Sequence, residues 1–279
     1  MVWTLDNTSL KPGGKSVKQL FSYTFPSPED FLPGDPKNID TKELEIKKQE
    51  SSSAASTSIS RSEIISRAES YANHSFYVSS SNITSTSGYY CSGKTVITPV
   101  TSSGYYTGIP YKWGGFTGLT GVTSYTDYCG YFYDEGLDAG KYAGDKDTTT
   151  TFGVCCAVGV DCSGFVSQTW GLSDKKSTAT LRDISSKLQS KEDLSKGDVL
   201  IMLKDPDYGN HVRLFVRRET DGKYTVYEAS ARDWKTSIYS YTASQLNGYE
   251  SYRYNNLSGC VYCSDYSYYR SHSPIYHGG

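Results

Sequence analysis

The sequence predicts an α+β fold in which a short helix packs on an antiparallel sheet. Two observations favour this class. Apolar residues recur at helical spacing in residues 62–73 and 161–170, and three β-type runs follow at residues 198–203, 211–218 and 223–230. Consecutive strands with short connections pair antiparallel, and a helix with one apolar stripe buries it on another element. A chain of 279 residues can hold one large domain, or one domain with an appendage.

The N-terminal half of the sequence holds one clear helical pattern. Residues 62–73 follow a Ser/Ala/Thr-rich run, residues 49–60, which is typical of a linker. Residues 75–108 are rich in Ser, Thr, Tyr and Gly, a composition that favours loops or short hairpins. The predicted buried stripe of the helix consists of Ile64, Ile65, Ala68, Tyr71 and Ala72.

A cysteine opens the second predicted helix. Asp161 can cap this helix, because its carboxylate can accept the free backbone N–H groups of the first turn. Cys162 then lies where the partial positive charge of the helix is strongest, and this field favours the nucleophilic thiolate over the thiol. Phe165, Val166 and Trp170 give the helix an apolar face. A cysteine in this setting is either a nucleophile or a small core residue, and a partner base decides between the two.

His211 is the candidate base. It opens the second predicted strand, where the backbone is held by the sheet and the imidazole can reach a helix N-terminus. Taken alone, a histidine in this position is more often structural, but together with Cys162 it becomes the better candidate for the base. Asp221-Gly222 is a turn signal that joins this strand to the next in a hairpin. A further helix is predicted near residues 181–189.

The register of the hairpin decides whether Glu228 can reach His211. A two-residue turn would place Glu228 opposite Phe215, too far from His211. A longer loop over residues 219–222 keeps Glu228 on the same face and makes it a diagonal neighbour of His211, where it would orient the imidazole. Otherwise Glu228 is a strand residue that faces solvent. The next candidates for the orienting group are Ser230 and Asp233.

Four short motifs follow one another along the chain. They are residues 108–115 (GIPYKWGG), 161–166 (DCSGFV), 194–199 (LSKGDV) and 210–212 (NHV). In this order they resemble the NlpC-type cell-wall peptidases, which are papain-like cysteine peptidases that cut peptidoglycan stem peptides. The resemblance covers about residues 59–235. It implies a papain-like fold with Cys162 as nucleophile, His211 as base and Glu228 as the polar third member.

The resemblance also implies a substrate site. It implies that Tyr111 and Trp113 line the active site, and that Asp161 and Ser163 help form a pocket for the free amine of the stem peptide. The oxyanion would be held by the backbone N–H of Cys162 and by a second donor, for which Tyr111 is the candidate. No cofactor and no metal are implied.

The sequence departs from this family in three places. Residues 116–156 look like an insertion, because Trp113 and Cys162 are much further apart than is usual. Arg213 stands after His-Val where small residues are common, and the hairpin is longer than usual. In addition, residues 165–168 (FVSQ) are similar to a related group of amidases.

Composition narrows the partners and the location. A net charge of −2 means that the chain has no excess of positive charge with which to bind nucleic acid or an anionic membrane. No run of about 18 apolar residues occurs, so no membrane-spanning segment is expected. Asp6, Asn7 and Lys11 interrupt any apolar signal-peptide core, so a secreted or cell-surface protein would be a mature fragment.

Seven cysteines suggest an oxidising compartment. If one is a nucleophile, six remain, enough for three disulfides. Cys155 and Cys156 are adjacent, so we expect different partners for them. Bridges from the insertion to the C-terminal tail would anchor both additions. Zinc is the alternative, but only Cys260-x-x-Cys263 has a suitable spacing. Reduced thiols are a third possibility.

These observations predict one organisation and one function. Residues 1–58 would form an extension and linker, and residues 59–279 a catalytic domain with the insertion and a Tyr-rich tail at about 239–279. The tail tyrosines either stack on sugars or serve packing. The expected function is a secreted or cell-surface cysteine endopeptidase that acts on peptidoglycan or its muropeptide fragments. The alternatives are a related cysteine amidase, an acyl-transfer toxin, or a non-catalytic wall-binding module.

Overall fold

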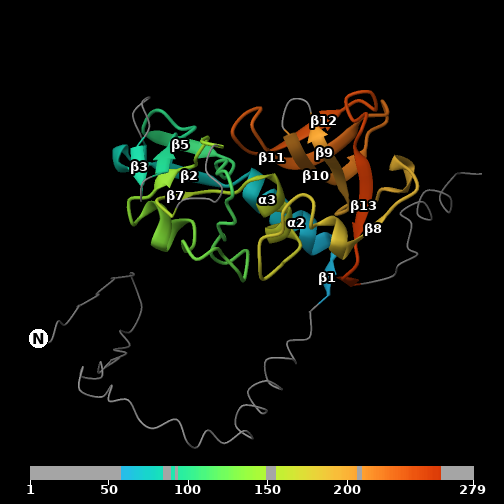
Figure 1. The fold of residues 1–279 in the computed structure, drawn as a ribbon, viewed down its shortest axis with the longest axis horizontal. Helices are drawn as coiled ribbons and strands as arrows, with labels where there is room; N and C mark the ends of the chain where they lie inside the picture. The colour runs from blue at the N-terminus through green and yellow to red at the C-terminus, as the bar shows by residue number, and fades with distance from the viewer. Residues whose placement is uncertain (1–57, 84–88, 92–93, 149–154, 206–208, 259–279) are drawn as a thin grey trace, which may run out of the picture. The chain divides into compact units, whose positions relative to one another are not determined.

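The structure is a computed structural model in which few helices are combined with antiparallel sheets, as the α+β prediction requires (Figure 1). The extension and most of the linker lie outside the described residues, as do Cys260 and Cys263, so the predictions made for them stay predictions. The structure describes residues 58–83, 89–91, 94–148, 155–205 and 209–258.

A six-stranded sheet carries the C-terminal half of the described chain. Its strand order is β12-β11-β10-β9-β13-β8, and each neighbouring pair runs antiparallel. The three strands predicted from the sequence are β9, β10 and β11, which confirms them. The strands are β8 (Ser185–Lys187), β9 (Val199–Asp205), β10 (Gly209–Arg218), β11 (Tyr224–Ser230), β12 (Lys235–Tyr241) and β13 (Glu250–Tyr254).

The helix predicted near residues 181–189 is wrong. The chain makes only a single 3₁₀ turn, Arg182–Ile184, and then extends as β8. Serines at positions 185 and 186 are weak helix formers. β13 offers backbone partners to this segment, with Ser186 paired with Arg253. Pairing with a distant strand therefore outweighs the local helical pattern.

At its His211 end, the hairpin of β10 and β11 has the register expected from the longer loop, but at the turn Arg218 pairs with Tyr224, which neither predicted register gives. Leu214 pairs with Tyr227, and a bulge after Phe215 shifts the register towards the turn. This pairing sets Glu228 across from Arg213 and diagonal to His211. A bulge inserts an extra residue and increases strand twist, which the turn sequence alone does not specify.

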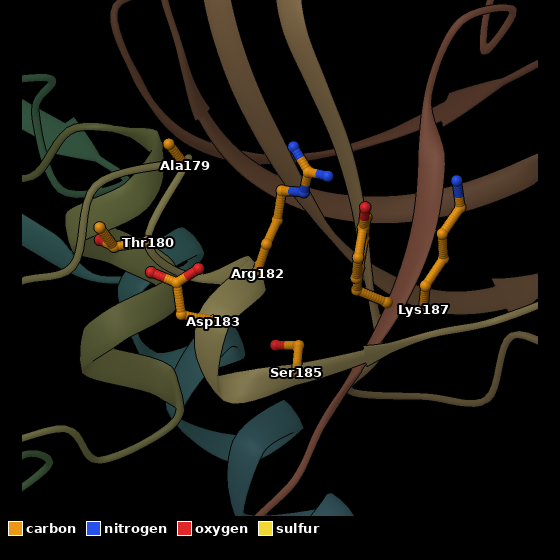
Figure 2. A pocket seen from close by; sticks show the side chains of 7 residues that line it. Ala179, Thr180, Arg182, Asp183, Ser185 and Lys187 are labelled. Carbon is orange, nitrogen blue, oxygen red and sulfur yellow. The ribbon is translucent and has the colours of Figure 1, made fainter.

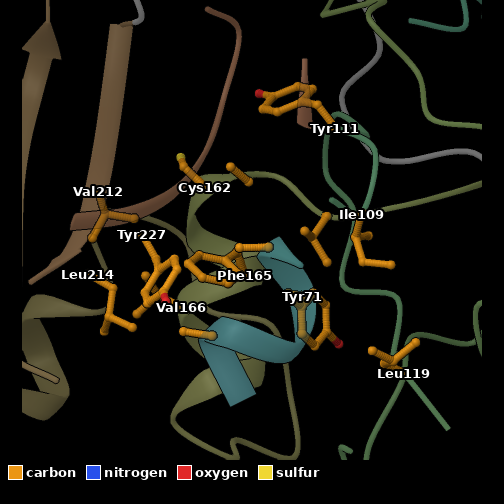
Figure 3. Packing of buried hydrophobic residues seen from close by; sticks show 14 of the residues in the cluster. Tyr71, Ile109, Tyr111, Leu119, Cys162, Phe165, Val166, Val212, Leu214 and Tyr227 are labelled. Atoms are coloured by element: carbon orange, nitrogen blue, oxygen red, sulfur yellow. The ribbon is translucent and has the colours of Figure 1, made fainter. Parts of the chain in front are cut away.

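Two helices pack beside this sheet. α2 (Arg61–Ala72) matches the first predicted helix, and the Ser60 side chain caps it by accepting from the N–H of Glu63 at 3.1 Å. α3 (Cys162–Thr169) matches the second, and it contacts both α2 and the strands β10 and β11 (Figure 1). Tyr71 of α2 meets Phe165 of α3 edge to face at 5.9 Å, inside the main core (Figure 3). Every residue of α3 is buried.

The first turn of α3 lies directly against the loop that contains the Trp-Gly-Gly motif. A Cβ atom on Gly164 would sit 1.9 Å from the carbonyl oxygen of Gly115, which no side chain can tolerate. The N–H of Gly114 donates to Asp161 at 3.1 Å across the same contact. Glycine at position 164 therefore lets two of the motifs meet beside Cys162.

The N-terminal half of the described chain forms small two-stranded sheets. The expectation of loops or short hairpins in residues 75–108 is confirmed by the hairpin of β3 and β4, whereas β2 pairs antiparallel with the more distant β5. Parallel pairs join β6 to β7, and β1 to β14. The bounds are β1 (Ile59–Ser60), β2 (Ser75–Val78), β3 (Tyr89–Cys91), β4 (Lys94–Val96), β5 (Gly104–Thr107), β6 (Tyr142–Ala143), β7 (Ala157–Val158) and β14 (Leu257–Ser258).

The segment predicted as an insertion is held against the helices by hydrogen bonds. Gln168 of α3 donates to the carbonyl of Phe116 at 2.7 Å, and Tyr71 of α2 donates to the carbonyl of Thr117 at 2.9 Å. A disulfide joins Cys129 to Cys155 inside the segment. Most of the described insertion is loop, with one five-residue π-helical turn at Tyr133–Leu137.

The described part of the Tyr-rich tail, residues 239–258, contributes strands to the sheets. Its described residues form the end of β12, all of β13 and β14. Tyr254 stacks on Trp170 with ring centres 4.6 Å apart. The packing role is therefore confirmed for four tyrosines, each of which is buried: Tyr241, Tyr249, Tyr252 and Tyr254. No helix in the described ranges is long and apolar enough to cross a membrane.

Candidate active site

Cys162 is the first residue of α3, and its side chain points out of the helix N-terminus (Figure 3). The thiol is only 7 % exposed, and it is the free cysteine among the described side chains. Its sulfur lies 3.8 Å from the hydroxyl of Thr178 and 3.9 Å from the carbonyl oxygen of Asn210. The residue after Asn210 is His211, so the end of β10 reaches the thiol.

His211 is buried between Cys162 and Glu228. Its Nε2 lies 2.8 Å from Glu228 Oε2, which leaves Nδ1 as the ring nitrogen that can face the thiol. Burial by itself would lower the pKa of His211, but hydrogen bonds to Cys162 and Glu228, together with their charges, raise it to about 9. The site therefore favours a protonated imidazole over a neutral one at neutral pH.

Glu228 is a fully buried carboxylate with several donors around it. Besides His211, Arg213 Nε donates to it at 2.9 Å, and Arg232 Nη1 donates at 3.1 Å. His211 and Arg213 contact Oε2, whereas Arg232 and the hydroxyl of Tyr241 donate to Oε1. Burial raises the pKa of a carboxyl group, but the His211 hydrogen bond and the positive charges lower the pKa of Glu228 to about 2. The alternative in which Glu228 faces solvent is wrong.

Arg213, the departure noted after His-Val, belongs to this cluster. Its guanidinium lies 4.1 Å from the ring centre of Tyr241 and 4.2 Å from that of Tyr249, so two tyrosine faces hold it. The guanidinium of Arg213 therefore contacts both the Glu228 carboxylate and the two tyrosine rings, and its positive charge compensates part of the charge of Glu228. Ser230 and Asp233, the other candidates for the orienting group, are not required for this contact.

Tyr111 lies on the other side of the thiol. In Figure 3 its hydroxyl end is turned towards the side on which Cys162 lies. Burial and the nearby charges of Cys162 and Asp161 raise the pKa of Tyr111, so the phenol stays protonated and can donate. Its ring meets Trp234 edge to face at 5.4 Å. Trp234, which the sequence did not single out, adopts a positive φ of 55°.

Trp113 is placed differently from the other predicted site residues. Its backbone N–H donates to the carbonyl of Asp145 at 3.0 Å, and its half-buried side chain packs against the main core. Its role in substrate binding stays a prediction.

Asp161 and Ser163 flank the thiol in sequence and are both buried. Asp161 Oδ1 caps α3 by accepting from the N–H of Gly164 at 2.7 Å, and it also accepts from the Ser163 hydroxyl at 3.1 Å. Asp161 Oδ2 faces Lys175, whose Nζ is 3.0 Å away. Lys175 and Thr178 come from the loop after α3. No sequence signal marked them, because only the folding of that loop brings them to the helix N-terminus.

A surface pocket of about 550 Å³ continues from this loop. Thr178 touches the thiol, whereas the next residues, Ala179 and Thr180, already line the pocket (Figure 2). Arg182 lies over the Tyr252 ring, and Lys187 pairs with Glu250. Acidic and basic groups thus both occur at its rim. The lining residues are Ala179, Thr180, Arg182, Asp183, Ser185, Lys187 and Tyr252.

The cysteines follow the predicted pattern in part. Cys155 bonds to Cys129, and Cys156 is disulfide-bonded as well, so the adjacent pair has different partners as expected. The expectation of bridges from the insertion to the tail is wrong for Cys129 and Cys155, because these two close a loop within the insertion. The described residues contain no group of three or more His, Cys, Asp or Glu side chains that could hold a metal ion.

The arrangement brings a thiol, an imidazole and a carboxylate into one chain of contacts. A helix N-terminus supplies the thiol, and two strands of the sheet supply the other groups. An imidazole held by a buried carboxylate can exchange a proton with an adjacent sulfur, and the resulting thiolate is a nucleophile. The geometry is therefore suited to acyl transfer through a thioester.

The charges of His211 and Glu228 predict how stability depends on pH. The folded pKa of His211, about 9, lies above the usual value of about 6.5, so its contribution is complete below about pH 6.5 and is lost as pH rises through about 9. The folded pKa of Glu228, about 2, lies below the usual value of about 4.3, so its contribution is present above about pH 4.3 and is lost as pH falls through about 2.

We therefore expect the urea midpoint to be highest between about pH 4.5 and 6.5 and to fall on either side. The His211→Gln variant should lose much of the alkaline slope, because the group that titrates there is gone. Urea unfolding followed by tryptophan fluorescence across a pH series measures both. A wild-type midpoint that stays constant from neutral to alkaline pH would contradict the prediction.

Comparisons with known proteins give few matches. No protein-family model matches the sequence, and no curated protein matches it. Among solved structures, the chain is similar to the peptidoglycan hydrolase RipB from Mycobacterium tuberculosis, with 18 % identical residues and a TM-score of 0.30. The match covers 52 % of this chain and 57 % of the RipB chain, so it spans little more than half of either.

Proposed function

We propose that this chain is a secreted or cell-surface cysteine peptidase that hydrolyses an amide bond in peptidoglycan stem peptides. One observation carries the proposal for the reaction: Cys162, at the N-terminus of α3, lies beside His211, which is bonded to the buried Glu228 at 2.8 Å. The substrate class rests on the order of the four sequence motifs that resemble the NlpC-type peptidases. A helix with the thiol, packed on an antiparallel sheet with the imidazole, is consistent with a papain-like fold.

The proposed reaction proceeds in two steps. The sulfur of Cys162 attacks the amide carbon, and the protonated His211 gives its proton to the leaving amine, so that a thioester forms as the C–N bond breaks. Water then attacks the thioester. His211 takes a proton from the water, and the released thiolate is again paired with the imidazolium. Glu228 orients His211 throughout and stabilises its charge.

Two donors are available for the developing oxyanion. The backbone N–H of Cys162 lies in the first turn of α3, where it has no acceptor within the helix. The hydroxyl of Tyr111 stays protonated and is the second donor. Both lie at the positive end of the helix, which favours the negative oxygen.

Digestion of purified muropeptides tests the proposal. We expect products whose masses show that water has been added across an amide bond within the stem peptide, with none from the Cys162→Ala variant under the same conditions. Release of the whole stem from the glycan would indicate an amidase instead. Transfer of the acyl group to an added amine would indicate a transferase, and binding without products would indicate a wall-binding module. Each of these three outcomes would overturn the proposed peptidase.

A further inference from the structure

An ammonium group of this chain contacts the two residues that flank the candidate nucleophile in sequence. Lys175 Nζ is 3.0 Å from Asp161 Oδ2 and donates to the hydroxyl of Ser163 at 3.1 Å. Its side chain is 25 % exposed, whereas that of Asp161 is 9 % exposed. Because Asp161 and Ser163 are the two neighbours of Cys162 in sequence, the ammonium lies at the helix N-terminus that also carries the thiol.

The loop that carries Lys175 is held against α3 by contacts just after this residue. The N–H of Lys176 donates to the hydroxyl of Ser167 on α3 at 3.0 Å. Further along, the buried Thr178 touches the sulfur of Cys162 at 3.8 Å. These contacts fix the backbone from which the Lys175 side chain reaches Asp161.

Asp161 has a complete set of partners only when Lys175 is present. Oδ1 accepts from Gly164 and Ser163, and Oδ2 accepts from the N–H of Gly114 and pairs with Lys175. Without the ammonium, a largely buried carboxylate and a hydroxyl oxygen would face the space that Lys175 Nζ occupies. A carboxylate with little access to water attracts a cation, and a primary ammonium of a substrate would fit the same two acceptors.

We propose that Lys175 is a specificity-determining residue that occupies an ammonium-binding pocket formed by Asp161 and Ser163. The wild-type chain then accepts peptides whose amino end is acylated, as it is when a peptide remains attached to a larger polymer. A free amine must displace a tethered ammonium, which competes at a high effective concentration. The inference rests on the proposed function for its substrate class, and it replaces the expectation that Asp161 and Ser163 receive a free amine.

The first test does not depend on turnover. Lys175→Met keeps an unbranched side chain but removes the charge, and Lys176→Met is the matched control. The rate at which iodoacetamide alkylates Cys162 is followed by mass spectrometry, with L-alaninamide or N-acetyl-L-alaninamide added. In Lys175→Met we expect L-alaninamide to slow alkylation about tenfold more than its acetylated form, the size of effect that a hydrogen bond to a charged group has on binding.

In the wild type and in Lys176→Met, we expect the two compounds to have the same small effect. Equal effects in Lys175→Met would overturn the proposal, since the vacated pocket would then not bind an amine. Protection of the wild type by L-alaninamide alone would overturn it as well, because the pocket would already be open. Alkylation rates can be compared in Lys175→Met and in the wild type even if the chain cleaves no peptidoglycan. This test can therefore fail or succeed independently of the proposed function.

The second test uses turnover. The ratio of kcat/KM for a stem peptide with a free amino end to that for its N-acetylated form is measured in both proteins. We expect the wild type to favour the acetylated peptide and Lys175→Met to raise the ratio about tenfold. An unchanged ratio would contradict the inference. If the wild type cleaves neither peptide, the proposed function fails and the alkylation test alone decides on Lys175.

Discussion

The Cys162→Ala variant is expected to lose hydrolysis of muropeptides by about 10⁴- to 10⁶-fold, and His211→Ala by a similar factor, because residues that act as one nucleophilic unit are lost together. The double variant should be no worse than either single one. Neither alanine forms the thioester by the proposed route: the first removes the sulfur, and the second removes the group that shares its proton.

The measurement is the initial rate of muropeptide cleavage per folded molecule, with far-UV circular dichroism as the check on folding. His74→Ala is the matched histidine control. His74 bonds to the Tyr133 hydroxyl at 2.7 Å and packs against Phe132, without any described contact to the thiol. It should keep its activity even if its stability falls. Activity that survives in Cys162→Ala would show that another nucleophile does the chemistry.

The Glu228→Gln variant is expected to have the largest effect on stability. Glu228 is 0 % exposed and is paired with His211, Arg213 and Arg232. Glutamine has the same shape but no charge, so it leaves the buried guanidinium of Arg213 uncompensated, a change that costs about 3–5 kcal/mol. Activity per folded molecule should also fall, though less than in Cys162→Ala, because Glu228 orients the base and does not react.

A double-variant cycle separates the ion pair from the rest. Arg213→Met combined with Glu228→Gln removes both charges, so its free energy of unfolding should fall by less than the sum of the two single changes. Glu69→Gln, an exposed position on α2, is the control and should change stability by no more than about 0.5 kcal/mol. Urea denaturation provides all four values. Additive effects, or a stable Glu228→Gln, would mean that the carboxylate is not held by these charges.

Local patterns predicted the elements that carry the site. The cap at Asp161, the cysteine after it and the apolar face at Phe165 and Val166 are all within one short segment, and α3 forms there as expected. The run from His211 to Arg218 forms β10, because alternating and β-branched residues act over a few neighbours. Such features depend on side chains close in sequence, so a sequence is sufficient to find them.

The contact between His211 and Glu228 was predicted in part by the sequence and decided in part by the tertiary structure. The sequence limited the hairpin to two registers, since side chains alternate across a strand. Only the pairing of Leu214 with Tyr227, and the bulge after Phe215, selected the register that joins the imidazole to the carboxylate. The choice depends on how two strands and their neighbours pack, and not on the turn residues alone.

The remaining parts of the site were decided by tertiary structure alone. Lys175 reaches Asp161 because a loop folds back over α3, and Arg213 is held by rings from β12 and the segment after it. The helix predicted near residues 181–189 became β8 because β13, about 65 residues later, offered backbone partners. The sequence by itself thus determined which segments are helix or strand around Cys162 and His211. Contacts between segments distant along the chain determined the charges around them, because those charges depend on which side chains the completed fold brings together.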